Sequence, residues 1–179
     1  MPPSALREIN RRFYDDLWSN ARLVEPQRPN TWPLVQSLLP RRPRRLEVAP
    51  GLRPRLPIEG TQFLDVSVPA LVELAARGAR VAQGEICALP FASTSFDLVC
   101  AFDVIEHIDN DRLALAELCR VTASGGVLLL SVPLHASRWT VFDELVGHRR
   151  RYEPEALDSL LHQHALSVQH SAVYGMQPR

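Results

Sequence analysis

The feature that most constrains this chain is a series of short, almost continuously apolar runs that alternate with helical patterns. The clearest runs are SFDLVCAF at residues 95–102 and GVLLLSVP at 126–133. Strands that are apolar along their whole length are typical of parallel sheets covered by helices on both faces. The alternation therefore predicts an α/β fold, a doubly wound, mostly parallel and Rossmann-like sheet in a three-layer α/β/α arrangement.

The remaining elements follow from the same patterns. Ser67 is expected to cap one helix, Asp109 or Asn110 the next, and Pro154 to open the last. The third strand has a weaker pattern than the others, and the sixth is a candidate. Expected strands, besides the two above, cover residues 45–51, 61–67, 79–85 and 165–175, and expected helices cover 68–78, 111–121 and 154–164.

The segment before residue 45 has a different character. A rough apolar stripe predicts a helix from about Ser4 to Val24, and a short helix should run from Trp32 to Leu39, where Pro40 ends it. We therefore divide the chain into an N-terminal helical cap, residues 1–44, and a ligand-binding domain, residues 45–179. Phe13, Tyr14 and Trp18 on the first helix would either cover the ligand or simply pack on the sheet.

Composition excludes several classes of function. The 179 residues suit one domain, and 20 basic against 20 acidic side chains argue against a nucleic-acid-binding protein. Cys87, Cys100 and Cys119 form no CxxC pair, so no zinc or redox motif is expected. The N-terminus has no signal-like core, and no run is long enough to span a membrane, so a cytoplasmic protein is expected. The oligomeric state stays open.

Acidic side chains stand at or just after the ends of the expected strands. They are Glu47, Asp65, Glu85 and Asp103. A carboxylate at the end of a second strand can accept both hydroxyls of a ribose, because two oxygens match two adjacent O–H donors. Asp65 follows Glu47 by about 18 positions, near the ~20-residue spacing of the ribose acid in dinucleotide folds.

The turn after the first strand is EVAPGLRPRLP, with Gly51 as its single glycine. It contains no GxGxxG, and its prolines leave little room for a regular helix whose N-terminus could bind a pyrophosphate. This argues against a nicotinamide-dependent oxidoreductase, one alternative that we considered. A nucleoside ligand without phosphate, such as an adenosyl sulfonium, fits the turn better.

Five segments in order resemble the class I S-adenosylmethionine-dependent methyltransferases, in particular small-molecule enzymes of methyltransferase type 11. The longest is GEICALPFASTSFDLVCAFDVIEHIDN, with an acid, Leu-Pro-Phe, Ser-Phe-Asp, an apolar strand and Glu-His. The others are LEVAPG, FLDVS, RVTASGGVLLLSVP and GHRRRYEPEALDSLL. The resemblance covers about residues 45–161 and implies S-adenosyl-L-methionine as cofactor.

Carried over by position, the resemblance gives each strand end a role. Glu47 and Gly51 would border the methionine part, Asp65 would hold the ribose, and Glu85 would meet the adenine amine. Phe102 and Asp103 would lie by the methionine amino group. The full set of implied cofactor-binding residues is Glu47, Ala49, Gly51, Asp65, Val66, Glu85, Ile86, Phe102 and Asp103.

The acceptor side is less defined. We expect a small-molecule or lipid-like acceptor, with His107 or His135 as a catalytic base where one is needed. His148, Arg149 and Tyr152 would bind an anionic acceptor or simply shape a loop. No metal is expected, because no histidine pair at ligand spacing comes with a third ligand.

Two questions stay open at this stage. The family sheet has seven strands, so either the chain is truncated or residues 166–175 pair with the fifth strand; an unfilled slot would expose strand edges. The single-glycine turn and the short C-terminal region also leave room for an alternative function, a non-catalytic binding protein with a methyltransferase fold.

Overall fold

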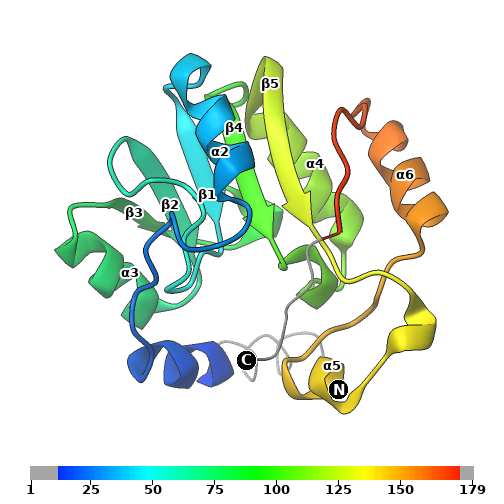
Figure 1. The fold of residues 1–179 in the computed structure, drawn as a ribbon, viewed down its shortest axis with the longest axis horizontal. Coiled ribbons are helices and arrows are strands. Elements are labelled where there is room, and N and C mark those ends of the chain that lie inside the picture. The colour runs from blue at the N-terminus through cyan, green and yellow to red at the C-terminus, as the bar shows by residue number, and fades with distance from the viewer. Residues whose placement is uncertain (1–11, 174–179) are drawn as a thin grey trace.

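The computed structural model describes residues 12–173, which form one five-stranded sheet (Figure 1). All neighbouring strands are parallel, in the order β3-β2-β1-β4-β5. The predicted doubly wound fold is therefore confirmed. The strands are β1 (Arg45–Val48), β2 (Thr61–Asp65), β3 (Arg80–Gln83), β4 (Phe96–Phe102) and β5 (Thr122–Ser131).

Helices connect and cover these strands. Asn110 caps α4, with its side-chain oxygen accepting the N–H of Leu113 at 3.0 Å, as one of the two expected caps. Ser67 precedes α3, but its hydroxyl makes no cap bond. The α-helices are α2 (Trp32–Leu38), α3 (Val68–Ala76), α4 (Asp111–Val121), α5 (Val141–Leu145) and α6 (Pro154–Gln163); the 3₁₀ turns are η1 (Leu39–Arg41), η2 (Ile86–Ala88), η3 (Ile105–His107) and η4 (Ala136–Arg138).

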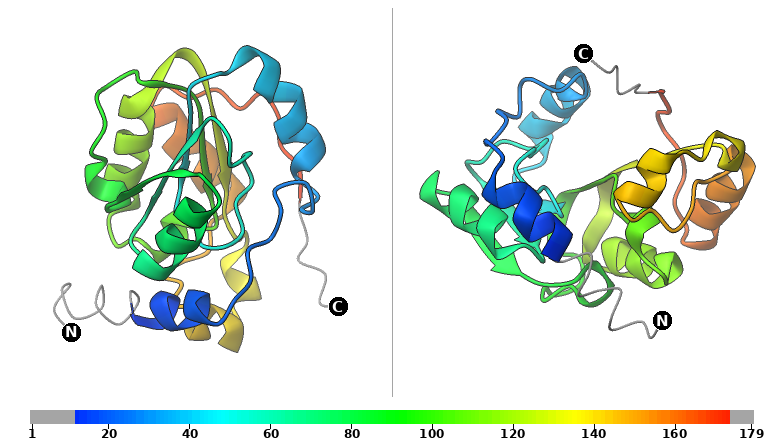
Figure 2. Two further views of the ribbon diagram at one scale, coloured as in Figure 1. Left: turned by 90° about the vertical axis from the view of Figure 1, so that its left-hand side faces the viewer. Right: turned by 90° about the horizontal axis from the view of Figure 1, so that it is seen from below.

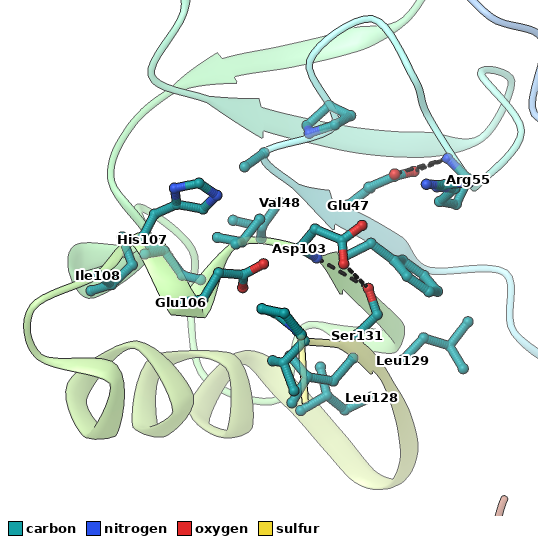
Figure 3. A pocket seen from close by; sticks show the side chains of 18 of the residues that line it. Glu47, Val48, Arg55, Asp103, Glu106, His107, Ile108, Leu128, Leu129 and Ser131 are labelled. Carbon is teal, nitrogen blue, oxygen red and sulfur yellow. Dashed lines mark hydrogen bonds between the residues drawn. The ribbon is translucent and has the colours of Figure 1, made fainter. Parts of the chain in front are cut away.

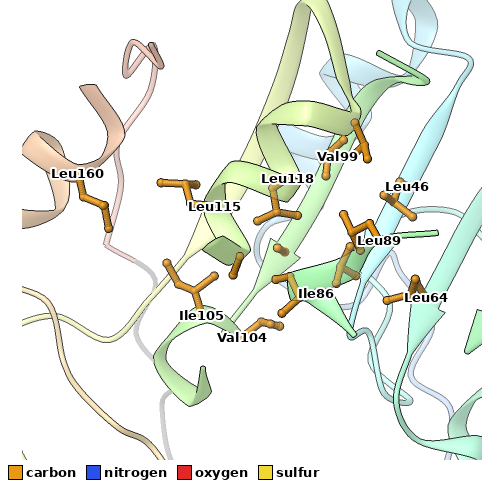
Figure 4. Close-up of a cluster of buried hydrophobic side chains, with 14 of the residues drawn as sticks. Leu46, Leu64, Ile86, Leu89, Val99, Val104, Ile105, Leu115, Leu118 and Leu160 are labelled. Atoms are coloured by element: carbon orange, nitrogen blue, oxygen red, sulfur yellow. The ribbon is translucent and has the colours of Figure 1, made fainter. Parts of the chain in front are cut away.

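The core has two parts, one on each face of the sheet. On one face, Leu46 and Val99 pack against Leu115 and Leu118 of α4 (Figure 4). On the other face, Val35 of α2 packs with Leu56, Leu98 and Cys100. The side view shows the sheet between α2 and α4, which gives the three expected layers (Figure 2). Because successive residues of a strand point to opposite faces, β4 supplies both clusters, with Val99 in the first and Leu98 and Cys100 in the second.

Some expected elements are wrong or shifted. Residues 165–173 form no strand, so the version in which this segment pairs with the fifth strand is contradicted for the described residues. Within the described part of the chain β5 is one of the two edges of the sheet, and its apolar residues are only partly buried. The first helix is described from residue 12 and ends at 19, whereas residues 21–24 are not helical. The predicted residues 1–11 and 174–175 lie outside the described region.

The segment before residue 45 is packed on the rest of the protein. Val35 of α2 is fully buried in the second core cluster, with Trp32 and Leu38 packed against it. Residues 12–19 lie across the carboxyl ends of the strands (Figure 1). The division at residue 44 stays a prediction. Among residues 12–173, no helix is both long enough and apolar enough to cross a membrane.

The packing of α4 gives a stability prediction. Leu118 is fully buried, whereas Leu113 on the same helix is 44% exposed. We expect Leu118→Ala to lower the unfolding free energy by about 2–5 kcal/mol, because it loses apolar burial and leaves a cavity. Leu113→Ala, the matched control, should cost less than about 1 kcal/mol. Urea unfolding measures both, and equal losses would contradict this assignment of the core.

Candidate active site

The candidate site lies beyond the carboxyl ends of the strands. The strand order reverses between β1 and β4, and in open α/β sheets ligands bind in the crevice at such a switch point. A broad depression here, the strand-end pocket, is lined by the loops that follow all five strands. The helical residues 12–19 and α5 flank it on the same side (Figure 1).

Glu47 organises the loop between β1 and β2. Its carboxylate accepts the backbone N–H of Arg55 at 2.8 and 3.0 Å and that of Leu56 at 2.8 Å. The side chain is 2% exposed, and burial raises its pKa to about 7 in spite of these bonds. Glu47 lines the pocket as predicted, but these hydrogen bonds give it a structural role in holding the loop.

The loop has no helix, as its prolines predicted, yet it follows a path that usually needs glycine. Ala49 has φ of 55° and Gly51 has φ of 51°, both in the left-handed region. A Cβ at Gly51 would overlap the ring of Trp18. Gly51 is therefore required both by its backbone conformation and by the close approach of the N-terminal helix. It is buried beneath Trp18 and does not itself line the pocket.

Asp65 at the end of β2 joins three segments. Its carboxylate accepts the N–H of Gly51 and the N–H of Ser67, both at 2.9 Å. Burial raises its pKa, while these backbone bonds act in the opposite direction. A carboxylate offers about four lone-pair sites, so two remain for other donors. Asp65 thus keeps acceptor capacity at the end of β2 beyond the two bonds that hold Gly51 and Ser67.

The end of β3 lies beside Asp65. Asp65 pairs in register with Gln83, and its carbonyl accepts the N–H of Gly84 at 3.1 Å. Glu85 follows directly and is exposed, whereas Ile86 is buried. Asp65, Val66, Glu85 and Ile86 all line the strand-end pocket. Two neighbouring strand tips therefore present a carboxylate each to one shared space, with apolar side chains between them.

The helical residues 12–19 are fastened across this space. The Ser67 hydroxyl donates to Asp15 at 2.8 Å, and the Tyr14 hydroxyl lies 3.3 Å from Nε2 of His107. Burial raises the pKa of Tyr14, so its hydroxyl stays protonated. With Trp18 over Gly51, the helix spans from the turn after β1 to the loop after β4. This supports a covering role for the predicted aromatic residues.

The end of β4 is tied to its neighbours on both sides. Asp103 has φ of 53°, and its side chain accepts the hydroxyl of Ser131, at the end of β5, at 2.8 Å. The guanidinium of Arg55 lies 5.5 Å from the centre of the Phe102 ring. Figure 3 shows Asp103 joined to Ser131, with Glu106 and His107 directed into the same opening. Phe102 and Asp103 thus lie at the pocket as predicted.

Behind Asp103, three side chains from two distant segments converge. One ligand-type atom each from Glu106, His107 and His148 lies within 4.8 Å of the others. Glu106 is fully buried, and burial raises its pKa to about 8. Burial and the neighbouring His148 lower the pKa of His107 to about 4. At neutral pH the imidazole of His107 is therefore uncharged.

His148 is held from behind by a buried acid. Its Nδ1 lies 2.8 Å from Oδ1 of Asp143. Arg151 donates to both oxygens of the same carboxylate, at 2.7 Å to Oδ1 and 2.8 Å to Oδ2. Burial acts to raise the pKa of Asp143, but hydrogen bonds from Arg151 and His148 outweigh it and lower that pKa. Asp143 also completes a capping box with Thr140 at the start of α5. The sequence analysis missed Asp143; the T-x-x-D pattern at 140–143 was the available signal.

Of the other predicted acceptor-side residues, only Arg149 lies beside this cluster. His135 is at the rim, 45% exposed, with Nδ1 3.4 Å from Glu153. Arg149 donates its backbone N–H to the Glu106 carbonyl at 2.7 Å. Tyr152 is buried in the core, and its hydroxyl donates to Asp111 at 2.8 Å. Because Tyr152 does not line the pocket, its position does not fit the predicted substrate-binding role and fits a structural one.

Comparison with known proteins identifies this arrangement. Residues 62–130 match the family described as a methyltransferase domain. This part of the chain is therefore similar to methyltransferase domains. The match spans β2 to β5, and so includes the strand ends that carry Asp65, Glu85 and the Glu106–His107 pair.

Individual relatives of this methyltransferase domain are distant. Malonyl-[acyl-carrier protein] O-methyltransferase of Enterobacter lignolyticus is 35% identical over 106 residues, which cover 55% of this chain and 42% of the relative. Demethylmenaquinone methyltransferase of Mycobacterium tuberculosis is 36% identical over 83 residues, 45% and 36% of the two chains. The chain thus spans about two fifths of the length of these relatives.

The fold of the methyltransferase domain also matches a solved structure. The YcgJ protein of Bacillus subtilis superposes with a TM-score of 0.59 at 20% identity, over 75% of this chain and 66% of the other. The shared architecture supports the fold described above. At this identity the likeness concerns the fold.

The contact between Gly51 and Trp18 can be tested with a matched pair of glycines. Gly78 also has positive φ, 82°, but no atom lies within 4 Å of its virtual Cβ. We expect Gly78→Ala to cost roughly 1–2 kcal/mol for the left-handed backbone alone. Gly51→Ala should cost about 1–3 kcal/mol more, because Trp18 must move. Equal losses of unfolding free energy would show that Trp18 does not lie on Gly51.

The raised pKa of Glu47 predicts a pH dependence of stability. Its pKa is about 7 in the folded protein against an ordinary 4.5, so between these values the folded state retains a proton that the unfolded state has lost. The contribution of Glu47 to stability therefore falls as pH rises through this window, by up to about 1.4 kcal/mol per pH unit.

Urea unfolding of the wild type and Glu47→Gln at several pH values isolates this effect. The difference in unfolding free energy between the two proteins should shift in favour of the variant as pH rises from 5 to 7. Parallel pH profiles would contradict the raised pKa of Glu47.

Proposed function

We propose that this chain is an S-adenosyl-L-methionine-dependent methyltransferase that methylates a small-molecule or lipid-like acceptor. The observation that carries the proposal is the convergence of Asp65 and Glu85 on one pocket at neighbouring strand tips. Two carboxylates with apolar residues between them suit a neutral nucleoside, whose hydroxyls and amine are donors. The similarity to methyltransferase domains supplies the reaction type.

The residues at the strand ends fit the cofactor. Asp65 would accept the ribose hydroxyls, Glu85 the exocyclic amine, and Val66 and Ile86 would border the adenine. Asp103, held by Ser131, would face the methionine amino group, with Phe102 alongside. Glu47 and Gly51 would act indirectly, by fixing the conformation of the loop that contains Ala49. When bound, the cofactor supplies a methyl group activated by a sulfonium.

The acceptor would enter between the loops after β4 and β5 and the short helix α5. Leu134, Phe142 and Leu145 line this side of the pocket and favour an apolar acceptor body. A neutral His107 or the rim residue His135 would accept a proton from the acceptor where the chemistry requires one. His148 and Arg149 would contact polar groups of the acceptor. The relatives act on malonyl-[acyl-carrier protein] and demethylmenaquinone, which we propose as first acceptors to assay.

We further propose a cytoplasmic location. The three cysteines are free thiols in the structure, which suits a reducing compartment. Residues 1–44 would act as a cap, in which helix 12–19 covers the cofactor. Neither nucleic acid nor a membrane span is part of the proposal.

One observation favours the alternative of a non-catalytic binding protein. With helix 12–19 in place Asp65 is 4% exposed, so a cofactor can reach its carboxylate only if this helix moves. A chain that kept the helix closed would retain the fold without turnover. Isothermal titration with S-adenosylhomocysteine, followed by assays of methyl transfer, separates the two functions: binding without transfer to any acceptor supports the alternative.

The ribose role of Asp65 gives the matching mutational test. Asp65→Asn keeps the size of the side chain but removes the charge and one acceptor, so we expect S-adenosylhomocysteine to bind about 10- to 100-fold more weakly. The control is Asp97→Asn, at the opposite end of β4, where the carboxylate pairs with Arg44. The control should leave the affinity unchanged. An unaltered dissociation constant in Asp65→Asn would refute the ribose role.

A further inference from the structure

Glu106 is the least explained side chain of the site. It is fully buried, and neither carboxylate oxygen has a hydrogen-bond partner among the described residues. A buried carboxylate without donors is costly, and such groups in native proteins are normally paired or coordinate a cation. The nearest cationic candidate is Nε2 of His148, 3.9 Å from Oε1. That separation exceeds a hydrogen bond, so a direct bond does not satisfy Glu106.

The neighbours of Glu106 are ligand atoms rather than donors. One nitrogen each of His107 and His148 and one carboxylate oxygen of Glu106 lie within 4.8 Å of one another. Ligands about 2.0–2.2 Å from one ion are roughly 3–3.5 Å apart, so small side-chain rotations would bring these three onto a common centre. The imidazole rings of His107 and His148 already meet edge to face, with their centroids 4.7 Å apart.

The hydrogen bonds behind His148 fix which nitrogen faces the cluster. Asp143 forms an ion pair with Arg151, so its carboxylate accepts hydrogen bonds and donates none. Nδ1 of His148, 2.8 Å away, is therefore the donor and carries a proton. In the neutral imidazole this leaves the lone pair on Nε2, which lies 3.9 Å from Oε1 of Glu106. A carboxylate that orients a histidine in this way is typical of the residues behind metal ligands.

We propose that Glu106, His107 and His148 bind one divalent transition-metal ion, with its remaining coordination positions open to the strand-end pocket. Two imidazoles and one carboxylate suit Zn²⁺, Fe²⁺ or Co²⁺ better than Mg²⁺ or Ca²⁺, which prefer oxygen ligands. No metal was expected from the sequence, because His107 and His148 are far apart in the chain. The fold instead joins η3, after β4, to the loop after α5.

This ion would also narrow the range of acceptor molecules, an inference that rests on the proposed function. An open coordination position beside the cofactor pocket would hold a hydroxyl, keto or carboxylate oxygen of the acceptor. His107, with its lone pair on the ion, would then not serve as the base. We therefore expect the acceptor to be a small molecule with an oxygen atom that can coordinate the ion.

The direct test is a Co²⁺ titration of untagged, chelator-stripped protein, followed by visible absorption. We expect one ion per chain, with the d–d bands of a low-coordinate site, and displacement of Co²⁺ by Zn²⁺. Glu106→Gln and His148→Gln should each weaken binding at least tenfold. The matched control is His162→Gln, an exposed histidine of α6, which should bind as the wild type does.

A second variant separates a metal site from mere packing. Asp143→Asn leaves all three ligands in place but removes the charge behind His148, and we expect a 10- to 100-fold loss of Co²⁺ affinity. Thermal unfolding monitored by circular dichroism shows whether each variant is folded. If a ligand variant unfolds, the wild-type titration and the remaining variants decide whether the cluster binds a metal ion.

The outcomes for metal and cofactor are distinguishable. S-adenosylhomocysteine binding, measured on the same stripped protein, tests the proposed function without the ion. Cofactor binding without any Co²⁺ bands, or equal Co²⁺ binding in the wild type and the ligand variants, would overturn the metal site alone. Co²⁺ binding without cofactor binding would leave the metal site standing and refute the proposed function.

Discussion

The carboxylate of Asp65 is the interaction on which the geometry of the site depends. By accepting N–H groups from Gly51 and Ser67, it joins the end of β2 to the turn after β1 and to the start of α3. These bonds fix the spacing of the strand tips that border the pocket. The same side chain lies at the edge of the pocket, so one residue both shapes the pocket and lines it.

Glu47 extends this arrangement to a loop that has no helix of its own. No helix lies between β1 and β2, because the prolines of this loop disfavour one. Glu47 compensates by binding the backbone of Arg55 and Leu56 from inside the sheet. Trp18 then covers Gly51 from outside. A buried acid and an aromatic ring together replace the order that a helix would provide.

Much of the fold could be predicted because it rests on local patterns. Continuous apolar runs marked the strands, and Asn110 and Pro154 marked helix starts, where hydrogen bonding and φ are set by the residue itself. Residues 165–173 contain apolar residues but form no strand, because a strand needs a paired neighbour that a local pattern cannot supply. The positions of Asp65 and Glu85 followed from strand ends meeting at one edge of the sheet.

What could not be predicted depends on contacts between distant segments. Tyr152 was predicted to bind substrate because it lies within GHRRRY, but its ring is buried in the core and its hydroxyl donates to Asp111. The Glu106, His107 and His148 cluster exists only because the loop after α5 folds back over η3. Its pairing with Asp143, Arg151 and Thr140 likewise requires the folded loop.

The central claim is that carboxylates at neighbouring strand tips hold one adenosyl group. A crystal structure of the protein grown with S-adenosylhomocysteine tests this most directly. The account predicts both ribose hydroxyls within hydrogen-bonding distance of Asp65 and the adenine amine near Glu85, with helix 12–19 shifted or closed over the ligand. A ligand bound elsewhere, or a ribose held by other side chains while Asp65 keeps only Gly51 and Ser67, would contradict it.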